Sequence, residues 1–188
     1  MFVLGSSSPR RKKLMGEDIA HSFIIDPSYI DESSSLFFKP LKAVKDIAKR
    51  KGIDVSKKHP NDIVITADTI VVINKQIIVK PKDENDAFKM LKLLSNKTHK
   101  VITAYYIYTK EKQILNYDVS FVKFNKLSDQ TILDYIKTKS PMDKAGAYGY
   151  QDNEKFHLIK DIKGSVKNVI GFPSEKIIED LHKLNIKF

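Results

Sequence analysis

Two short polar stretches that follow apolar runs carry side chains suited to chemistry. The first, residues 5–11, reads GSSSPRR directly behind the apolar residues 2–4. Four of its side chains could donate hydrogen bonds to an anion, those of Ser6, Ser8, Arg10 and Arg11. Glycine lets backbone approach a ligand, hydroxyls and guanidinium forks suit phosphate oxygens, and a helix beginning at Pro9 would turn free N–H groups toward the same point. The stretch predicts an anion site, although a capped helix with solvated arginines would use the same residues.

The second stretch, residues 65–69, reads ITADT and brings a carboxylate to the end of an apolar strand. Chemistry in α/β proteins is commonly placed at such strand ends. Asp68 could accept a proton from water, bind a divalent cation, or cap a turn. The residue alone does not decide among these three roles.

Three further stretches add charged and polar groups. They contain Asp31 and Glu32 in IDES, Lys80 in VKPKD, and Lys144 and Gln151 in DKAGAYGYQD. A lysine held before a proline in a stiff turn is well placed to meet a phosphate. Acidic and basic groups at several strand ends therefore predict a pocket that contains charges of both signs.

The elements that must position these residues alternate between strand and helix patterns. Strands are expected at residues 2–4, 62–73, 76–79, 99–109, 113–124 and 156–162. Helices are expected from Pro9 to Gly16, from Pro40 to a stop at Gly52, and after Asp83, Ser128 and Ser174. Residues 99–124 form a predicted antiparallel hairpin, and crossovers also occur. The pattern predicts one α/β domain over residues 1–188 with a mixed sheet.

Composition limits the class of protein. The 188 residues are 41% hydrophobic and include no cysteine, which excludes a disulfide framework, thiolate metal sites and a cysteine nucleophile. No apolar run approaches the roughly 20 residues of a membrane span, so we expect a cytoplasmic protein without membrane contact. The net charge of +10 makes polyanions plausible partners, although lysines are scattered along the whole chain.

Seven dispersed motifs, in order, resemble those of the Maf proteins, nucleoside triphosphate pyrophosphatases historically called septum-formation inhibitors. The motifs are GSSSPRR, DES, ITADTIVV, VKP, LSNKTHKVITA, DKAGAYGYQD and GSVKNVIGFP. The match as a whole runs from residue 3 to about residue 173. The resemblance implies an elongated, twisted mixed sheet flanked by helices. It also implies two lobes around a deep nucleotide cleft, as in the inosine triphosphate pyrophosphatases.

The resemblance also implies a reaction and roles for the residues. A nucleoside triphosphate is hydrolysed to the monophosphate and pyrophosphate with Mg²⁺ or Mn²⁺. Asp68 matches the family's proton acceptor, with Glu32 as its companion carboxylate and a second candidate metal ligand. The matching phosphate-binding residues are Ser6, Ser8, Arg10, Arg11, Lys51 and Lys80.

Three positions distinguish subgroups of this family, and here they hold Arg11, Thr69 and Gln151. This combination resembles the dTTP/UTP pyrophosphatase subgroup, whereas the subgroup resembling 7-methyl-GTP pyrophosphatases usually has other residues there. Modified pyrimidine triphosphates are further candidate substrates. The chain departs from the family pattern at Asp152, which stands where glycine is usual and puts a charge beside Gln151.

The alternative class of function is a protein that binds nucleic acid without catalysis. A non-catalytic nucleic-acid-binding regulator of cell division would explain the basic charge, but the acidic residues at strand ends would repel a polyanion. We therefore expect a nucleotide substrate and no stable nucleic-acid complex, and a homodimer is compatible with the sequence. The five histidines lack metal-ligand spacing and are expected at the surface or at strand ends.

Overall fold

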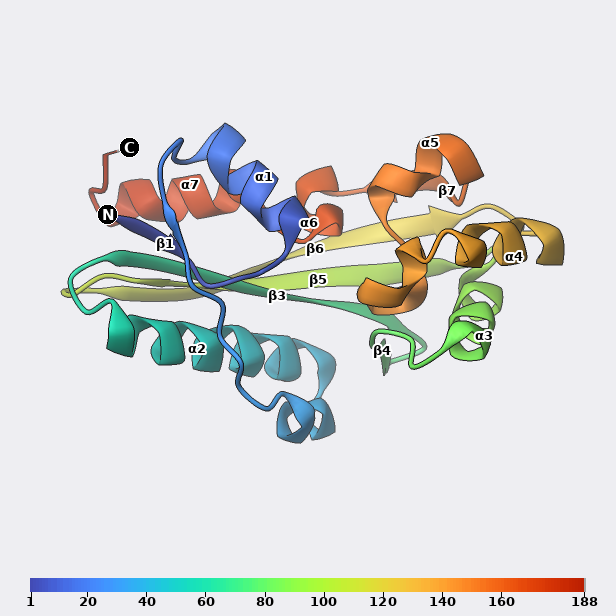
Figure 1. The fold of residues 1–188 in the computed structure, drawn as a ribbon, viewed down its shortest axis with the longest axis horizontal. Helices are drawn as coiled ribbons and strands as arrows, with labels where there is room; N and C mark the ends of the chain where they lie inside the picture. Colours follow the sequence, from blue (N-terminus) through green and yellow to red (C-terminus); the bar gives the residue numbers. More distant parts are fainter. Residues whose placement is uncertain (188) are drawn as a thin grey trace. The chain divides into compact units, whose positions relative to one another are not determined.

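The computed structural model describes residues 1–187, which form a mixed sheet with helices (Figure 1). The strands are β1 (Phe2–Leu4), β2 (Ile24–Ile25), β3 (Ile63–Ile73), β4 (Gln76–Ile78), β5 (Thr98–Tyr108), β6 (Gln113–Phe124) and β7 (Ile159–Lys163). Their order is β2-β1-β3-β5-β6-β7, with β4 paired to β3. Parallel and antiparallel pairs both occur, which confirms the predicted α/β class and mixed sheet.

The chain divides into two compact units. Unit 1 comprises residues 1–69, 103–118 and 171–188, and unit 2 comprises residues 70–102 and 119–170. Strands β3, β5 and β6 each contribute residues to both units. The expectation of one domain over residues 1–188 stays a prediction.

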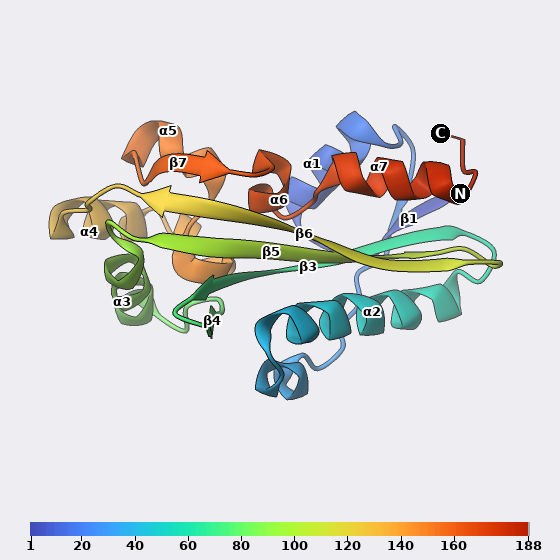
Figure 2. The same ribbon diagram turned by 180° about the vertical axis from the view of Figure 1, so that it is seen from behind.

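In unit 1, the strand register brings the two chemical stretches together. Strand β1 runs parallel to β3 with Leu4 opposite Ile65, and Gly5 N donates to Ile65 O at 2.9 Å. Residues 5–11 therefore leave the sheet beside residues 66–69. Helices α1 (Pro9–Asp18) and α7 (Ser174–Lys183) cover one face of these strands, and α2 (Pro40–Lys58) covers the other (Figures 1 and 2).

The core of unit 1 explains why these elements form. Apolar and aromatic side chains from both helical layers and from the strands are buried, among them Leu4, Met15, Ile47, Ile65, Tyr105, Tyr106 and Leu181. Tyr105 and Tyr106 of β5 pack inside the unit. The short 3₁₀ helix η1 (Ser33–Phe37) was not anticipated, because its five residues are too few for a periodic pattern.

Unit 2 has its own core and capped helices. Helices α3 (Glu84–Leu94) and α4 (Asp129–Lys137) begin behind Asp83 and Ser128, whose side chains accept backbone N–H bonds from Asp86 and Thr131 at 2.7 and 3.1 Å. These caps confirm the predicted helix starts. The remaining elements are α5 (Asn153–Phe156), α6 (Val166–Ile170) and the 3₁₀ helices η2 (Ser140–Asp143), η3 (Ala145–Ala147) and η4 (Tyr150–Asp152).

The predicted stop of the second helix at Gly52 is wrong, because α2 continues to Lys58. A Cβ built on Gly52 would lie 2.1 Å from Tyr106 Cδ1 and 3.0 Å from Thr66 Oγ1. The glycine thus permits a close approach of the helix to the sheet. It serves packing and not helix termination.

Two other predictions need correction. The last strand begins at Ile159 and not at residue 156, because α5 ends at Phe156 and His157 takes a left-handed backbone conformation with φ 49°. His99 is not at the surface: its side chain is buried against the rings of Phe124 and Tyr148. Within residues 1–187, no helix combines the length and the apolar character that crossing a bilayer requires.

Candidate functional site

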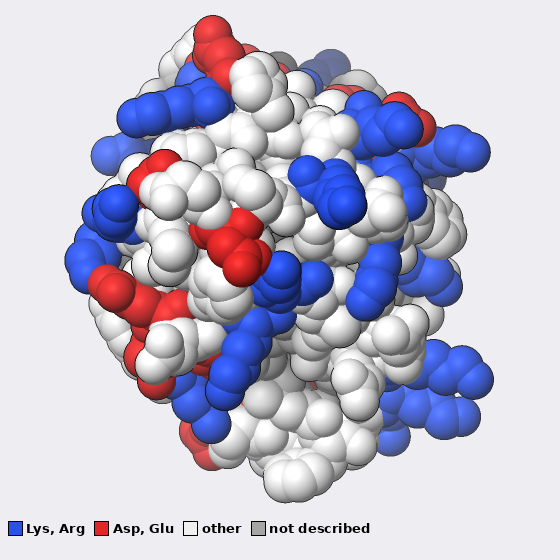
Figure 3. All heavy atoms as spheres, turned by 90° about the vertical axis from the view of Figure 1, so that its right-hand side faces the viewer, with Lys and Arg blue, Asp and Glu red and all other residues white. Residues whose placement is uncertain are grey.

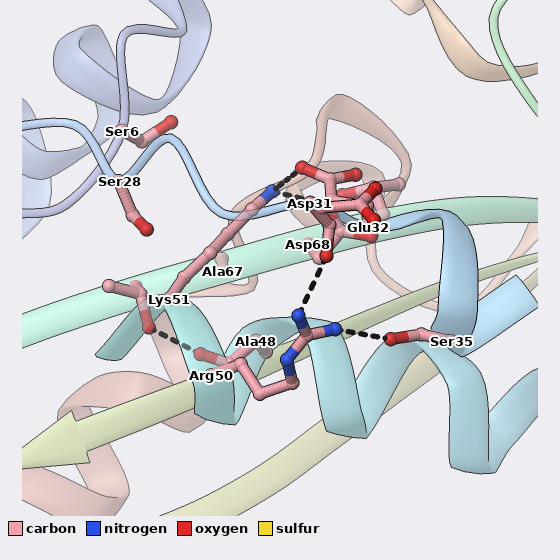
Figure 4. Close-up of polar contacts among 12 residues, drawn as sticks. Ser6, Ser28, Asp31, Glu32, Ser35, Ala48, Arg50, Lys51, Ala67 and Asp68 are labelled. Atoms are coloured by element: carbon pink, nitrogen blue, oxygen red, sulfur yellow. Dashed lines mark hydrogen bonds and ion pairs between the residues drawn. The ribbon is translucent and has the colours of Figure 1, made fainter. Parts of the chain in front are cut away.

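Lys51 links the two acidic residues of the candidate site in unit 1. It lies on α2, and its Nζ is 2.7 Å from Glu32 Oε1 and 2.9 Å from Asp68 Oδ1 (Figure 4). The side chains of Lys51 and Asp68 are each 13% exposed, whereas that of Glu32 is 46% exposed. Two of the three ammonium N–H donors are therefore engaged, and the third can face a ligand.

Asp68 lies in the middle of β3 (Ile63–Ile73), so the prediction of a carboxylate at a strand end is wrong, because the strand continues through Thr69. Its carboxylate is largely removed from water. This burial raises the pKa of Asp68, while the positive charges of Lys51 and Arg11 oppose the rise. A carboxylate whose pKa is raised above its ordinary value is a stronger base toward a nearby water molecule. The geometry thus suits proton acceptance better than turn capping.

Arg11 is held by four hydrogen bonds in unit 1. Its Nε donates to Gly171 O at 2.8 Å, and its Nη1 donates to Ala67 O at 2.8 Å and Ser6 Oγ at 3.3 Å. Its Nη2 donates to Thr69 Oγ1 at 3.0 Å. A guanidinium has five N–H donors, so the described residues leave one, on Nη2, for a ligand. Arg11 is an orienting group as much as a phosphate clamp.

The hydroxyl of Thr69 connects Arg11 to a residue that sequence reasoning missed. Thr69 Oγ1 lies 2.9 Å from Thr103 Oγ1 on β5, and Thr103 is fully buried. Because Thr69 accepts from Arg11, its hydroxyl proton is directed away from the guanidinium. Thr103 stands within the motif LSNKTHKVITA, which was the available signal for it. Gly171 likewise stands within the motif GSVKNVIGFP, but the contact of its carbonyl with Arg11 Nε involves a backbone atom, which the motif does not indicate.

The serines of the first loop divide between two roles. Ser8 is the N-cap of α1, and its Oγ accepts the N–H of Arg11 at 3.5 Å. Ser6 Oγ accepts from Ser8 N at 3.3 Å and from Arg11, so its hydroxyl proton can be donated to an anion. Arg10 follows on the first turn of α1 and is half-buried. The capped helix is therefore present together with the arginine cluster.

Lys80 and Gln151 belong to unit 2, where both side chains are exposed. The Gln151 amide lies against Gly149, where an added Cβ would come within 2.4 Å of its Nε2. Their participation in a site with the residues of unit 1 stays a prediction. The structure brings together Ser6, Arg11, Glu32, Lys51, Asp68 and Thr69.

The structure explains the charge of Asp152. Its Oδ2 accepts the hydroxyls of Tyr135 at 2.6 Å and Ser140 at 2.8 Å. Burial raises the pKa of Tyr135, and the hydrogen bond to this carboxylate raises it further. Asp152 thus ties η4 to α4 and η2 within unit 2, and its carboxylate is engaged in doing so.

The carboxylates of Glu32 and Asp68 fit a hard divalent cation. Lys51 Nζ pairs with one oxygen of each, Glu32 Oε1 at 2.7 Å and Asp68 Oδ1 at 2.9 Å, so each carboxylate keeps a second oxygen for a cation beside the ammonium group. Mg²⁺ prefers oxygen ligands and is often held by one or two carboxylates together with substrate phosphates and water. Among the described residues there is no group of three or more His, Cys, Asp or Glu that could hold a metal ion. The donor set therefore fits a cation shared with a phosphorylated substrate.

The sequence model of the family "Maf-like protein" matches residues 1–184. The chain belongs to the Maf-like protein family. This confirms the resemblance inferred from the seven motifs.

Curated members of the family match over nearly their whole length and carry the name dTTP/UTP pyrophosphatase. The protein from Acholeplasma laidlawii is 43% identical, over 99% of this chain and 97% of its own length. The proteins from Pyrococcus furiosus and Aquifex aeolicus are 42% and 39% identical, over 97% and 98% of this chain and 96% and 95% of their own lengths. The Maf-like chain is thus similar along its whole length to proteins of that name.

Proposed function

We propose that this chain hydrolyses dTTP and UTP, and related modified pyrimidine triphosphates, to the monophosphate and pyrophosphate. The observation that carries the proposal is its full-length similarity, at 39–43% identity, to three relatives named dTTP/UTP pyrophosphatase. The acidic and basic groups around Lys51 support it, because hydrolysis at phosphorus needs both a base and positive charge. We expect the enzyme to act in the cytoplasm.

Asp68 is the proposed proton acceptor. Its Oδ2 would take a proton from the water that attacks the α-phosphorus, while Oδ1 stays bonded to Lys51. The bond to Lys51 orients the carboxylate, and the burial that raises its pKa strengthens it as a base. A Mg²⁺ or Mn²⁺ ion held by Glu32 and Asp68 would supply neutralisation of the charge that develops on the pyrophosphate.

Positive charge and hydroxyl donors would hold the triphosphate. Ser6 can donate its hydroxyl proton, and Lys51 and Arg11 each keep one N–H for a phosphate oxygen. Ser8 supports this loop as the cap of α1. Arg10 and Lys80 complete the proposed phosphate contacts. The set provides the fixed geometry that an in-line displacement requires.

Base selectivity is assigned to Arg11, Thr69 and Gln151. Arg11 donates to the Thr69 hydroxyl at 3.0 Å, and with Thr103 as the donor in the 2.9 Å contact between the two threonines, the Thr69 proton would be left for an acceptor such as a pyrimidine carbonyl oxygen. The Gln151 amide offers both a donor and an acceptor. A site built to pair with one base edge rejects other bases, because its own polar groups would be left unpaired.

The alternatives are another triphosphate, such as 7-methyl-GTP, and a nucleic-acid-binding regulator. On the face drawn in Figure 3, Lys and Arg side chains are scattered, and Asp and Glu side chains are present among them. A polyanion-binding surface is expected to concentrate positive charge in a patch or stripe. The mixed charge of this face favours the enzyme, with no stable nucleic-acid complex.

The nature of the products tests the proposal. dTTP incubated with the protein and Mg²⁺ should give dTMP and pyrophosphate, resolved by phosphorus NMR or ion-exchange chromatography. Activity should disappear in EDTA and return with excess Mg²⁺ or Mn²⁺. Release of single phosphates with dTDP as an intermediate would show a phosphatase instead. Full activity in EDTA would remove the cation from the proposal.

A further inference from the structure

Arg50, which precedes Lys51 on α2, forms hydrogen bonds to the segment that carries Glu32. Arg50 Nη2 donates to the backbone oxygen of Asp31 at 2.7 Å, and Arg50 Nη1 donates to Ser35 Oγ at 2.9 Å (Figure 4). A weaker contact joins Nη1 to Ser34 Oγ at 3.4 Å. Arg50 thus contacts the chain on both sides of Glu32. Residues 31–35 are called the Glu32 segment below.

The C-terminal end of the Glu32 segment is more buried than its N-terminal end. Ser35 is fully buried, and its hydroxyl donates to Asp46 Oδ2 at 2.6 Å. Asp46 also lies 3.7 Å from Arg50 Nη1, one helical turn earlier on α2. Arg50, Ser35 and Asp46 therefore form a closed set of contacts between the helix and the segment. The segment adds its own turn, in which Asp31 accepts the N–H and the hydroxyl of Ser33, each at 2.9 Å.

Packing does not hold Glu32 itself. Its side chain is 46% exposed, and among the described residues it forms an ion pair with Lys51 at 2.7 Å. The position of an exposed carboxylate is set mainly by the backbone that carries it, because long side chains lose conformational entropy when they are fixed. The backbone of Glu32 is fixed in turn by the two-pronged contact of Arg50. The distance between Glu32 and Asp68 thus depends on Arg50.

Arg50 and Lys51, which are adjacent on α2, contact different parts of the Glu32 segment. Successive side chains on an α-helix point about 100° apart, so Lys51 reaches Glu32 and Asp68 while Arg50 reaches the backbone of the Glu32 segment (Figure 4). We propose that Arg50 is a positioning residue that holds Glu32 at the correct distance from Asp68 for a divalent cation. This inference rests on the proposed function for its effect on catalysis, but its effect on cation binding can be measured without substrate.

The decisive variant is Arg50→Lys, which keeps the charge and loses the planar fork that spans Asp31 O and Ser35 Oγ. The probe is Mn²⁺ alone, titrated into the substrate-free protein and followed by electron paramagnetic resonance of the free ion. We expect the dissociation constant to rise about fivefold or more, since the loss of one or two hydrogen bonds loosens the segment. Lys49→Ala is the matched control. It removes a charge from an exposed neighbour on the same helix and should leave the constant within about twofold.

A double-mutant cycle separates positioning from a general structural role. The rate parameter kcat/KM for dTTP is compared for wild type, Arg50→Lys, Glu32→Gln and the double variant. If Arg50 acts through Glu32, Arg50→Lys should lower kcat/KM in the wild-type background and have little further effect beside Glu32→Gln. Equal losses in both backgrounds would show a structural role and overturn the inference.

The failure of this inference is distinguishable from the failure of the proposed function. Wild-type protein that does not hydrolyse dTTP or UTP would reject the function, and the Mn²⁺ titration would still test Arg50. Wild-type activity together with an unchanged Mn²⁺ constant in Arg50→Lys would reject the role of Arg50 alone. Wild-type protein that binds no Mn²⁺ in the absence of substrate would also overturn the role proposed for Arg50.

Discussion

Arg11 donates from Nη2 to the hydroxyl oxygen of Thr69 at 3.0 Å. Three other bonds from the same guanidinium reach Gly171 O, Ala67 O and Ser6 Oγ. The residue therefore fixes residues 5–11, the middle of β3 and the proposed base-reading hydroxyl in one arrangement. Burial lowers the pKa of Arg11, and Asp68 opposes this, so the group stays charged.

Arg11→Lys should lower kcat/KM for dTTP by about tenfold or more. Lysine keeps one charge but cannot direct four bonds from a rigid plane, so Thr69 would lose its orientation. Discrimination between dTTP and other triphosphates should fall together with the rate. Lys12→Ala, which removes a charge at an exposed position of the same helix, is the control and should stay within about twofold of wild type. Wild-type kinetics for Arg11→Lys would contradict this role.

Asp68→Asn should lower kcat by about 100-fold or more while nucleotide affinity changes only a few-fold. The amide preserves the shape of the side chain but cannot accept the proton from water. Single-turnover rates and an equilibrium binding assay with dTTP measure the two effects separately. Turnover near the wild-type value would remove Asp68 from its catalytic role.

Gly52→Ala should destabilise the fold by about 1–3 kcal/mol, because the added methyl group would lie 2.1 Å from the Tyr106 ring. Gly16→Ala provides a matched helical control. There the added Cβ would lie 3.7 Å from Phe23, so that substitution should be neutral or stabilising. Urea unfolding of both variants makes the comparison. Equal stability of the two variants would show that α2 can move away from the sheet without cost.

The stability of the fold should fall on mild acidification because of His99. Burial lowers the pKa of His99 to about 4. The unfolded chain binds a proton below about pH 6.5, while the folded chain does so only below about 4. The stabilising effect is thus complete above pH 6.5 and is lost as the pH falls toward 4. Between pH 7.5 and 5, this linkage amounts to about 2 kcal/mol.

Urea unfolding of wild type and His99→Gln at pH 7.5 and pH 5 tests this effect. The free energy of unfolding of the wild type should decrease more between the two pH values than that of the variant. Because each protein is compared with itself, a constant loss of stability from the substitution does not affect the result. The same decrease in both proteins would assign the pH dependence to other groups.

The sequence was sufficient to predict every strand of the described residues except the two-residue β2, although not the start of β7, together with the caps of α3 and α4. These features depend on local periodicity and on side chains near the helix ends. The sequence could not predict what Gly52 does, since a glycine that ends a helix and one that touches Tyr106 look alike in sequence. The burial of His99 among aromatic rings could not be predicted from the sequence either. These features depend on contacts between residues far apart in the chain.

The candidate site divides in the same way. Asp68, Arg11 and Thr69 could be singled out because they follow apolar runs or match family motifs. The Gly171 carbonyl that holds Arg11 is a backbone atom 160 residues away, and nothing in its side chain indicates the contact. Arg50 could not be singled out from the sequence, because its partners are a backbone oxygen and the hydroxyls of Ser34 and Ser35.

The central claim is most directly tested by kcat/KM for pyrophosphate release, measured with one protein preparation on dTTP, UTP, CTP, ATP, GTP and 7-methyl-GTP in the presence of Mg²⁺. The account predicts that dTTP and UTP are the best substrates and that ATP, GTP and 7-methyl-GTP lag by about tenfold or more, a factor that requires about 1.4 kcal/mol of differential binding. If 7-methyl-GTP is the best substrate of the panel, the assignment to dTTP and UTP is wrong.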